Sequence, residues 1–292
     1  MKQAYKSIRI GKPGLALIEH VNQIIDEYRA AGYTMTLRQV YYQLVAKAII
    51  ENTERSYKNT GNLIKNGRLA GYIDWSAIED RTRNLRKQPA WDSPEQILEV
   101  AAKAYRRDLW ETQDHYLEVW VEKDAQIAVI EESASRLNCP CFSCRGFSSA
   151  TIMHDAALRF IEKTEQGKNC VLVYLGDHDP SGLNMTRDIN ERLDVFGVNV
   201  DVRRIALNRD QIDLYKPPVN FAKKTDSRWK KYAAEHGEYS WELDALPPEV
   251  IDGLITDAIK VNLDQKRFDN AIERQESERQ ALREMIGKEA VQ

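Results

Sequence analysis

The chain has 292 residues, an apolar fraction of 42% and a formal net charge of −3, so it can bury a sizeable core as one large domain or two modest ones. Its apolar runs are far shorter than the roughly 20 residues of a membrane helix, and its first residues lack the apolar core of a signal peptide. These patterns exclude a membrane-spanning class and predict a cytoplasmic protein.

The charge is distributed unevenly along the chain. Residues 1–112 contain 18 Lys and Arg against 13 Asp and Glu (+5), and residues 113–292 contain 24 against 32 (−8), which together give the net −3. A basic part beside an acidic part is typical of a chain that binds a polyanion with one region and a cation with the other. An uneven solvated surface would produce the same pattern.

The N-terminal part shows three helical patterns, which are expected to span residues 14–32, 36–50 and 57–70. Thr36 is a plausible N-cap for the second helix. Short extended pieces are expected around residues 72–75, followed by a basic run. Three helices, extended pieces and a basic run predict a winged-helix domain, assigned to residues 1–112, that binds double-stranded DNA.

Basic side chains in this part are candidates for contacts to backbone phosphates, which give affinity without sequence selectivity. They are Lys65, Arg68, Arg81, Arg83 and Arg86. A solvated charged face is an equally compatible interpretation. Residues 87–94 are expected to form a break, and residues 94–110 a connecting helix.

Strand and helix patterns alternate in residues 113–292. Apolar runs predict strands at residues 116–121, 141–144, 170–175 and 198–205, and helical patterns lie between them. This alternation predicts an α/β domain with a parallel sheet and helices on both faces. A long charged helix is expected at residues 257–286, as a C-terminal tail that is solvated or packs in a dimer.

Acidic side chains follow two of the predicted strands at the point where each strand ends. Glu122 follows the first strand, and Asp177 and Asp179 follow the third. Because the carboxyl ends of parallel strands meet at one edge of a sheet, these carboxylates are expected to converge. Close carboxylates repel one another unless a cation is present, and oxygen ligands favour Mg²⁺ or Mn²⁺. The sequence therefore predicts a divalent-metal site for phosphodiester chemistry.

Simpler interpretations of the same residues exist. Asp179 would cap a helix and Glu122 would end a strand in any ordinary α/β protein. His178 is expected to point away from the two aspartates and to pack. The four cysteines are expected to be reduced thiols, with a structural zinc site as the alternative.

Three motifs carry a resemblance to a known family. VEKDA, CRGFSSATIMHDAAL and LGDHDPSG resemble the Toprim motifs of topoisomerases, primases and nucleases, and GDHDPSGLNM resembles the topoisomerase VI A subunit and its relative, the meiotic double-strand-break transesterase. The resemblance covers residues 36–259, including WELDALPPEVIDGLI. It implies a winged-helix domain followed by a Rossmann-like Toprim domain, with Glu122, Asp177 and Asp179 on the family's metal ligands.

The resemblance also implies a nucleophile. The family carries its tyrosine in a segment of the type LRxxYY, which TLRQVYYQL matches, so Tyr42 is the expected nucleophile, Tyr41 the fallback and Arg38 a phosphate-orienting cation. A tyrosine hydroxyl needs nearby cations to react, and Arg38 lies one helical turn before Tyr42. Without the resemblance, both tyrosines would be interpreted as core aromatics of a DNA-binding helix.

The function expected from the resemblance is DNA strand breakage by a topoisomerase of the type IIB A-subunit class, acting as a homodimer in which one protomer's tyrosine works with the other's metal. The chain lacks an ATP-binding domain and resembles the compact Mini-A relatives, which leaves open a separate ATPase subunit and predicts a nucleoid-associated protein. The alternatives are a Toprim nuclease that uses water and a non-catalytic DNA-binding protein.

Overall fold

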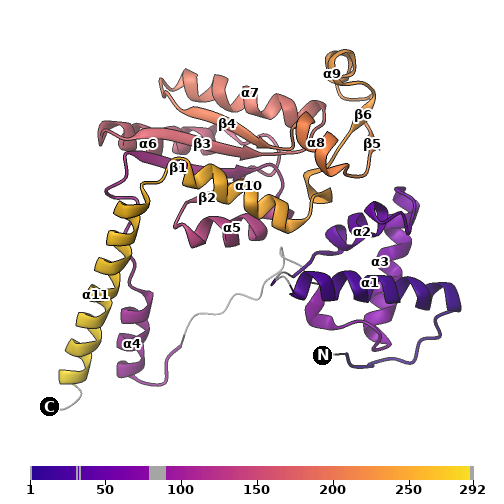
Figure 1. The fold of residues 1–292 in the computed structure, drawn as a ribbon, viewed down its shortest axis with the longest axis horizontal. Helices are drawn as coiled ribbons and strands as arrows, with labels where there is room; N and C mark the ends of the chain where they lie inside the picture. Colours follow the sequence, from indigo (N-terminus) through magenta and orange to yellow (C-terminus); the bar gives the residue numbers. More distant parts are fainter. Residues whose placement is uncertain (1, 31, 33, 79–89, 290–292) are drawn as a thin grey trace.

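A four-stranded parallel sheet lies at the centre of the computed structural model, which describes residues 2–30, 32, 34–78 and 90–289 (Figure 1). Its strands, in the order β2-β1-β3-β4, are β1 (His115–Val121), β2 (Cys141–Ser143), β3 (Asn169–Leu175) and β4 (Asp201–Ala206). Val121 at the end of β1 pairs with Leu175 at the end of β3. The two central strands therefore end side by side, as the sequence predicts.

Both faces of the sheet are covered by helices, because alternate side chains of β1 and β3 point to opposite faces. Leu117, Val119 and Val121 pack with residues of α5 (Ile127–Arg136) and α10 (Pro248–Lys260) in one core. Trp120, Leu172 and Tyr174 pack with residues of α6 (Ala150–Glu165) and α7 (Pro180–Val195) in the other. The expectation of an α/β fold with two covered faces is confirmed.

Three N-terminal helices share a separate apolar core: α1 (Lys12–Ala30), α2 (Leu37–Ala46) and α3 (Glu54–Leu69). Thr36 caps α2 as expected, in a capping box with Gln39. The helix ends four residues earlier than residue 50, because Ala48 turns the chain with a φ of 54°.

The extended pieces expected at residues 72–75 are not formed, and this prediction was wrong. Gly71 turns the chain with a φ of 79°. The Asp74 carboxylate then accepts a hydrogen bond from the Ser76 amide, which begins the short 3-10 helix η1 (Trp75–Ala77). Residues 81, 83 and 86 of the expected basic run, with the rest of residues 79–89, lie outside the described part of the chain.

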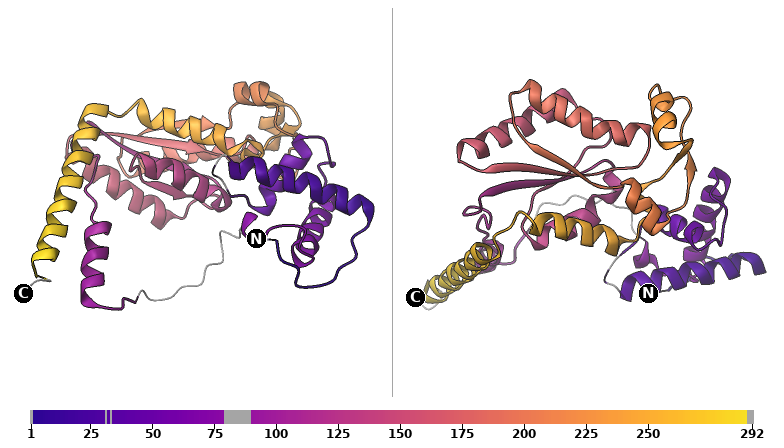
Figure 2. Two further views of the ribbon diagram at one scale, coloured as in Figure 1. Left: turned by 60° about the horizontal axis from the view of Figure 1, so that its bottom comes forward. Right: turned by 45° about the horizontal axis from the view of Figure 1, so that its top comes forward.

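Two helices run side by side away from the sheet in Figures 1 and 2: α4 (Pro94–Ala104) and α11 (Gln265–Glu289). The connecting helix is thus shorter than residues 94–110, and the long helix expected at residues 257–286 is interrupted between α10 and α11. Asp264 explains the interruption, because its backbone N–H and C=O both bond the side chain of Gln113.

An excursion follows β4 and returns to the sheet edge. It contains α8 (Arg209–Tyr215), β5 (Asn220–Phe221), α9 (Trp229–His236), β6 (Tyr239–Ser240) and the short helix η3 (Leu243–Ala245). The strands β5 and β6 pair antiparallel, and the backbone of His178 exchanges two hydrogen bonds with Trp241. In the part of the chain that the structure describes, no helix is both long and apolar enough to span a bilayer.

Candidate functional site

Glu122 and Asp177 lie in contact at the carboxyl ends of β1 and β3. The Glu122 amide extends the ladder by donating to the Leu175 carbonyl over 2.9 Å, so Glu122 is fixed beside the end of β3. Its Oε2 atom accepts a hydrogen bond of 3.0 Å from the Asp177 amide. Both carboxylates are buried, with 8% and 4% of each residue exposed. The predicted convergence of these two residues is therefore seen.

The close approach depends on glycine at the start of α7. A Cβ atom at Gly182 would lie 2.9 Å from Glu122 Oε2 and would overlap the Asp177 carbonyl oxygen. A Cβ atom at Gly176 would lie 2.8 Å from the same Glu122 oxygen. The LGDHDPSG turn thus brings the Glu122 carboxylate against the first turn of a helix, where backbone N–H groups favour negative charge.

Burial and mutual repulsion disfavour negative charge in this cluster. Burial, then the charge of Asp177, then that of Asp179 raise the pKa of Glu122, against the amide hydrogen bond that lowers it. Burial also raises the pKa of Asp177, against the effect of Lys123. Two neighbouring buried carboxylates with raised pKa values are the electrostatic condition in which a cation binds favourably.

Asp179 has a different local role. It is the N-cap of α7, and its Oδ1 atom accepts a hydrogen bond of 2.6 Å from the Gly182 amide. Across the described part of the chain, no three His, Cys, Asp or Glu side chains are grouped closely enough to hold a metal ion. Glu122 and Asp177 are thus brought together directly, whereas Asp179 reaches Glu122 only through its charge.

The Lys123 ammonium is the cation that faces this cluster. Its Nζ atom contacts Asp177 Oδ2 and lies 2.9 Å from Glu242 Oε2. Burial lowers the pKa of Lys123, but the charges of Asp177 and Glu242 outweigh it and raise the pKa above its usual value. Lys123 therefore stays charged and partly neutralises the acidic cluster.

Arg38, on α2, contacts Glu242, the carboxylate that also contacts Lys123. Its NH2 atom contacts Glu242 Oε2, and its Nε atom lies 2.8 Å from Asp244 Oδ2. Glu242 thus binds one cation from the helical N-terminal part and one from the end of β1. These contacts hold α2 against η3, at the edge of the sheet where the candidate metal ligands lie.

Tyr42 lies beside this network, whereas Tyr41 does not. The Tyr42 ring is 6% exposed, packs with Ala245, and lies under the Arg38 guanidinium at 5.6 Å. Burial and the charge of Glu242 raise the pKa of Tyr42 to about 12, against the charge of Arg38, which lowers it. The Tyr41 hydroxyl instead donates to the loop before α3, with 3.1 Å to Asn52 Oδ1 and to the Thr53 carbonyl.

A buried arginine supports the loop that carries the aspartates. Arg204 on β4 donates to the carbonyls of Gly176, Asp177 and Gly182 at 2.8, 2.6 and 2.9 Å. These carbonyls stand on both sides of Asp179. Arg204 therefore fixes the shape of the loop without reaching the carboxylates themselves.

His178 points away from the carboxylates, as expected. It is 2% exposed, its Nδ1 atom lies 3.0 Å from the Tyr232 hydroxyl, and its ring packs against His236 and Trp241.

The described DNA-contact candidates differ from each other. Lys65 is exposed on α3. Arg68 is half-buried: its guanidinium donates to the Trp75 and Ile78 carbonyls and stacks on the Trp75 ring at 4.6 Å. Arg68 thus stabilises the end of the N-terminal helical part.

Sequence reasoning missed four polar residues of this site, namely Lys123, Arg204, Glu242 and Asp244. Lys123 directly follows a predicted ligand, and Glu242 and Asp244 lie in the WELDALPP segment, so proximity and motif were the available signals. Arg204 gave none, because a lone arginine in a strand is usually a surface residue. No protein-family model, curated protein or solved structure matches this chain.

Proposed function

We propose that the protein cuts double-stranded DNA by transesterification, with Tyr42 as the nucleophile and a divalent metal held by Glu122, Asp177 and Asp179. One observation carries the proposal: a chain of contacts joins Tyr42 to the Glu122–Asp177 pair, although they come from segments far apart in the sequence. Arg38 lies over the Tyr42 ring and contacts Glu242, and Lys123 contacts both Glu242 and Asp177. A structural core aromatic needs no such connection to an acidic cluster. The proposed architecture is a winged-helix domain followed by a Toprim domain, related to the topoisomerase VI A subunit.

The donor set fits Mg²⁺ or Mn²⁺. Carboxylate oxygens are the ligands that these ions prefer, and burial, which raises the pKa values of Glu122 and Asp177, makes their negative charge unfavourable without a cation. When a metal binds, Lys123 would lose its contact with Asp177 and keep its contact with Glu242. When bound, the ion supplies charge neutralisation at the phosphate and at the leaving oxygen.

The side chains of this chain supply the nucleophile and its proton acceptor. At a pKa of about 12 the Tyr42 phenol is protonated at neutral pH, so it must lose its proton as it attacks. Glu242, whose charge acts on Tyr42, can take that proton while the oxygen–phosphorus bond forms. The deoxyribose oxygen leaves with the electrons of its bond and takes a proton from water. Arg38 and Lys123 hold positive charge beside the phosphate.

The partners remain those expected from the resemblance. We propose a homodimer, and a separate ATPase subunit stays open. In this structure Tyr42 lies beside the acidic cluster of its own chain, so a dimer that pairs it with the metal of the partner would have to separate α2 from η3.

A second candidate is a metal-dependent nuclease that uses water. The burial of Tyr42 favours it, because a nucleophile must reach its phosphate, and only 6% of this residue is exposed. Both candidates require the same metal site. They differ in whether a covalent protein–DNA bond forms.

Supercoiled plasmid, incubated with MnCl₂ or MgCl₂ and then denatured, separates the candidates. We expect wild-type protein to nick or linearise the plasmid and to stay covalently attached to DNA ends. Tyr42→Phe should lose both activities by about a thousandfold. Tyr41→Phe is the matched control and should retain them. Continued cleavage without adducts by Tyr42→Phe would establish the nuclease, and no metal-dependent cleavage by any variant would leave only DNA binding.

A further inference from the structure

The acidic C-terminal part contains one basic segment. Residues 221–236, which include α9, carry five Lys and Arg against two Asp and Glu, whereas residues 113–292 as a whole have a net charge of −8. In Figures 1 and 2 this segment protrudes beside the end of the sheet, close to α7. This segment therefore places a patch of positive charge beside the end of the sheet.

A pocket of about 460 Å³ lies between α7 and α9. Its cationic and polar lining includes Asn184, Arg187, Arg228, Lys231 and His236, with Glu235 as its one carboxylate among the described residues. Pro180, which also lines it, directly follows Asp179. The pocket therefore begins at the residue next to a proposed metal ligand.

The cations of the pocket differ in how they are held. Arg228 is fixed by two hydrogen bonds to Asp226, at 2.8 and 3.0 Å, and lies 5.0 Å from the centre of the Phe147 ring. The charge of Asp179 also raises the pKa of Arg228, after the larger effect of Asp226. Arg228 thus holds positive charge in the lining of the pocket.

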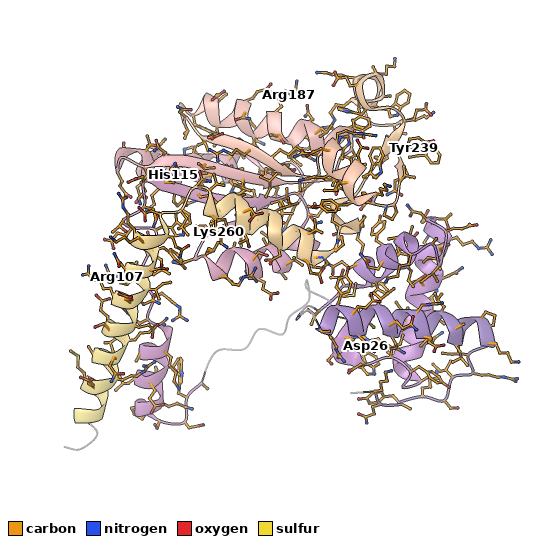
Figure 3. The ribbon with its side chains drawn as sticks, in the orientation of Figure 1. Asp26, Arg107, His115, Arg187, Tyr239 and Lys260 are labelled. Carbon is orange, nitrogen blue, oxygen red and sulfur yellow. The ribbon has the colours of Figure 1, made fainter. Side chains whose placement is uncertain are left out.

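Arg187 and Lys231 make few contacts that stabilise the fold. Arg187 projects from α7 (Figure 3), and 63% of its side chain is exposed. Its NH2 atom donates a hydrogen bond of 2.6 Å to Asn184 Oδ1 at the surface, and its Nε atom lies 3.5 Å from a Glu191 carboxylate that is equally exposed. Lys231 is exposed, and among the described residues no carboxylate pairs with it. Exposed pairs contribute little to stability, so neither cation is explained by folding.

We propose that the pocket between α7 and α9 binds backbone phosphates of the DNA strand being cut, through Arg187 and Lys231, on the Asp179 side of the metal centre. This inference rests on the proposed function. An open pocket whose cations stand on two separate helices fits a chain of phosphates that passes between them. Contacts of this kind fix the register of the strand and do not read its sequence.

Fluorescence anisotropy of a labelled DNA duplex, titrated in EDTA at several NaCl concentrations, tests the proposal apart from cleavage. Each phosphate contact adds about 0.9 to the steepness of the plot of log affinity against log salt concentration. Each contact therefore adds about a 3.5-fold loss of affinity between about 50 and 200 mM salt. The double variant Arg187→Gln/Lys231→Gln should therefore show a fall that is about twelvefold smaller. The charge-preserving variant Arg187→Lys/Lys231→Arg should keep the wild-type slope.

Lys260→Gln/Lys266→Gln is the matched control, because it removes the same charge from exposed positions at the end of α10 and the start of α11. It should leave the slope unchanged. An unchanged slope in the α7/α9 variant, or equal slopes in both double variants, overturns the proposal. Binding of inorganic pyrophosphate that the α7/α9 variant loses, with an unchanged DNA slope, would assign the pocket to a small phosphate ligand and also overturns it. Absence of covalent adducts, by contrast, removes the transesterase alone.

Discussion

Lys123 offers a direct test of the electrostatics of the acidic cluster. Its ammonium lies between Asp177, of which 5% of the side chain is exposed, and Glu242, of which 23% is exposed. Lys123→Met keeps the length of the side chain and removes the charge. Two partly buried carboxylates then lose the cation between them, with Glu242 still held by Arg38.

The expected loss of stability follows from burial. Breaking a fully buried ion pair costs about 3–5 kcal/mol, whereas exposed pairs contribute about 1 kcal/mol or less. Lys123 has 28% of its side chain exposed, so we expect about 2 kcal/mol. For a chain of this size, that loss lowers the melting temperature by about 4–8 °C.

Thermal unfolding in EDTA and in excess MgCl₂ checks the prediction. In EDTA the variant should melt below wild type. With Mg²⁺ the difference should shrink, because the metal supplies the charge that the ammonium supplied. Lys103→Met, at an exposed position of α4, controls for the substitution itself and should change little. A variant that loses no stability in EDTA, or loses the same amount with and without Mg²⁺, refutes the reasoning.

Three further predictions address other parts of the site. Gly182→Ala places a Cβ atom against Glu122 Oε2, so it should lower the free energy of unfolding by about 1–3 kcal/mol and abolish metal binding in calorimetry. Gly253→Ala, with open space around it, is the control and should be neutral or stabilising. Burial raises the pKa of Glu122 from 4.5 to about 7 on folding, so the metal-free protein should lose stability as the pH rises through that window. Stabilisation by Mg²⁺ should increase over the same range. A melting temperature in EDTA that rises from about pH 5 to pH 7 would contradict this. Arg159 pairs with Glu118, which is 2% exposed, so Arg159→Met should destabilise the protein by about 1–2 kcal/mol in urea denaturation. Arg159→Lys keeps the charge and should lose less stability. Equal stability of the two variants would argue against a charge effect.

The sheet could be predicted because its determinants are local. Apolar runs define β1 and β3, and the carboxylate that follows each strand falls at one edge once the strands are parallel. Glu122 and Asp177 thus meet for reasons visible in two short segments. The caps at Thr36 and Asp179 are similarly local, since each depends on one side chain and an amide three residues later.

The remainder of the site depends on contacts distant in sequence. Lys123 and Glu242 are 119 residues apart, and Arg38 and Glu242 are 204 apart. No periodicity in the sequence predicts such a pair, because each residue is an ordinary charged side chain in its own segment. The interruption before α11 is of the same kind, since Gln113 binds the backbone of Asp264 from 151 residues away.

If Arg38 orients a phosphate as proposed, its contact with two carboxylates means that the phosphate must compete with the protein for this cation. A phosphate that binds Arg38 takes it from Glu242 and Asp244, and Asp244 is almost fully buried. Anion exchange at one guanidinium would then loosen α2 from η3 at the moment that DNA arrives. Binding and domain separation would be one equilibrium, with DNA affinity reduced by the free energy of the contact that it replaces.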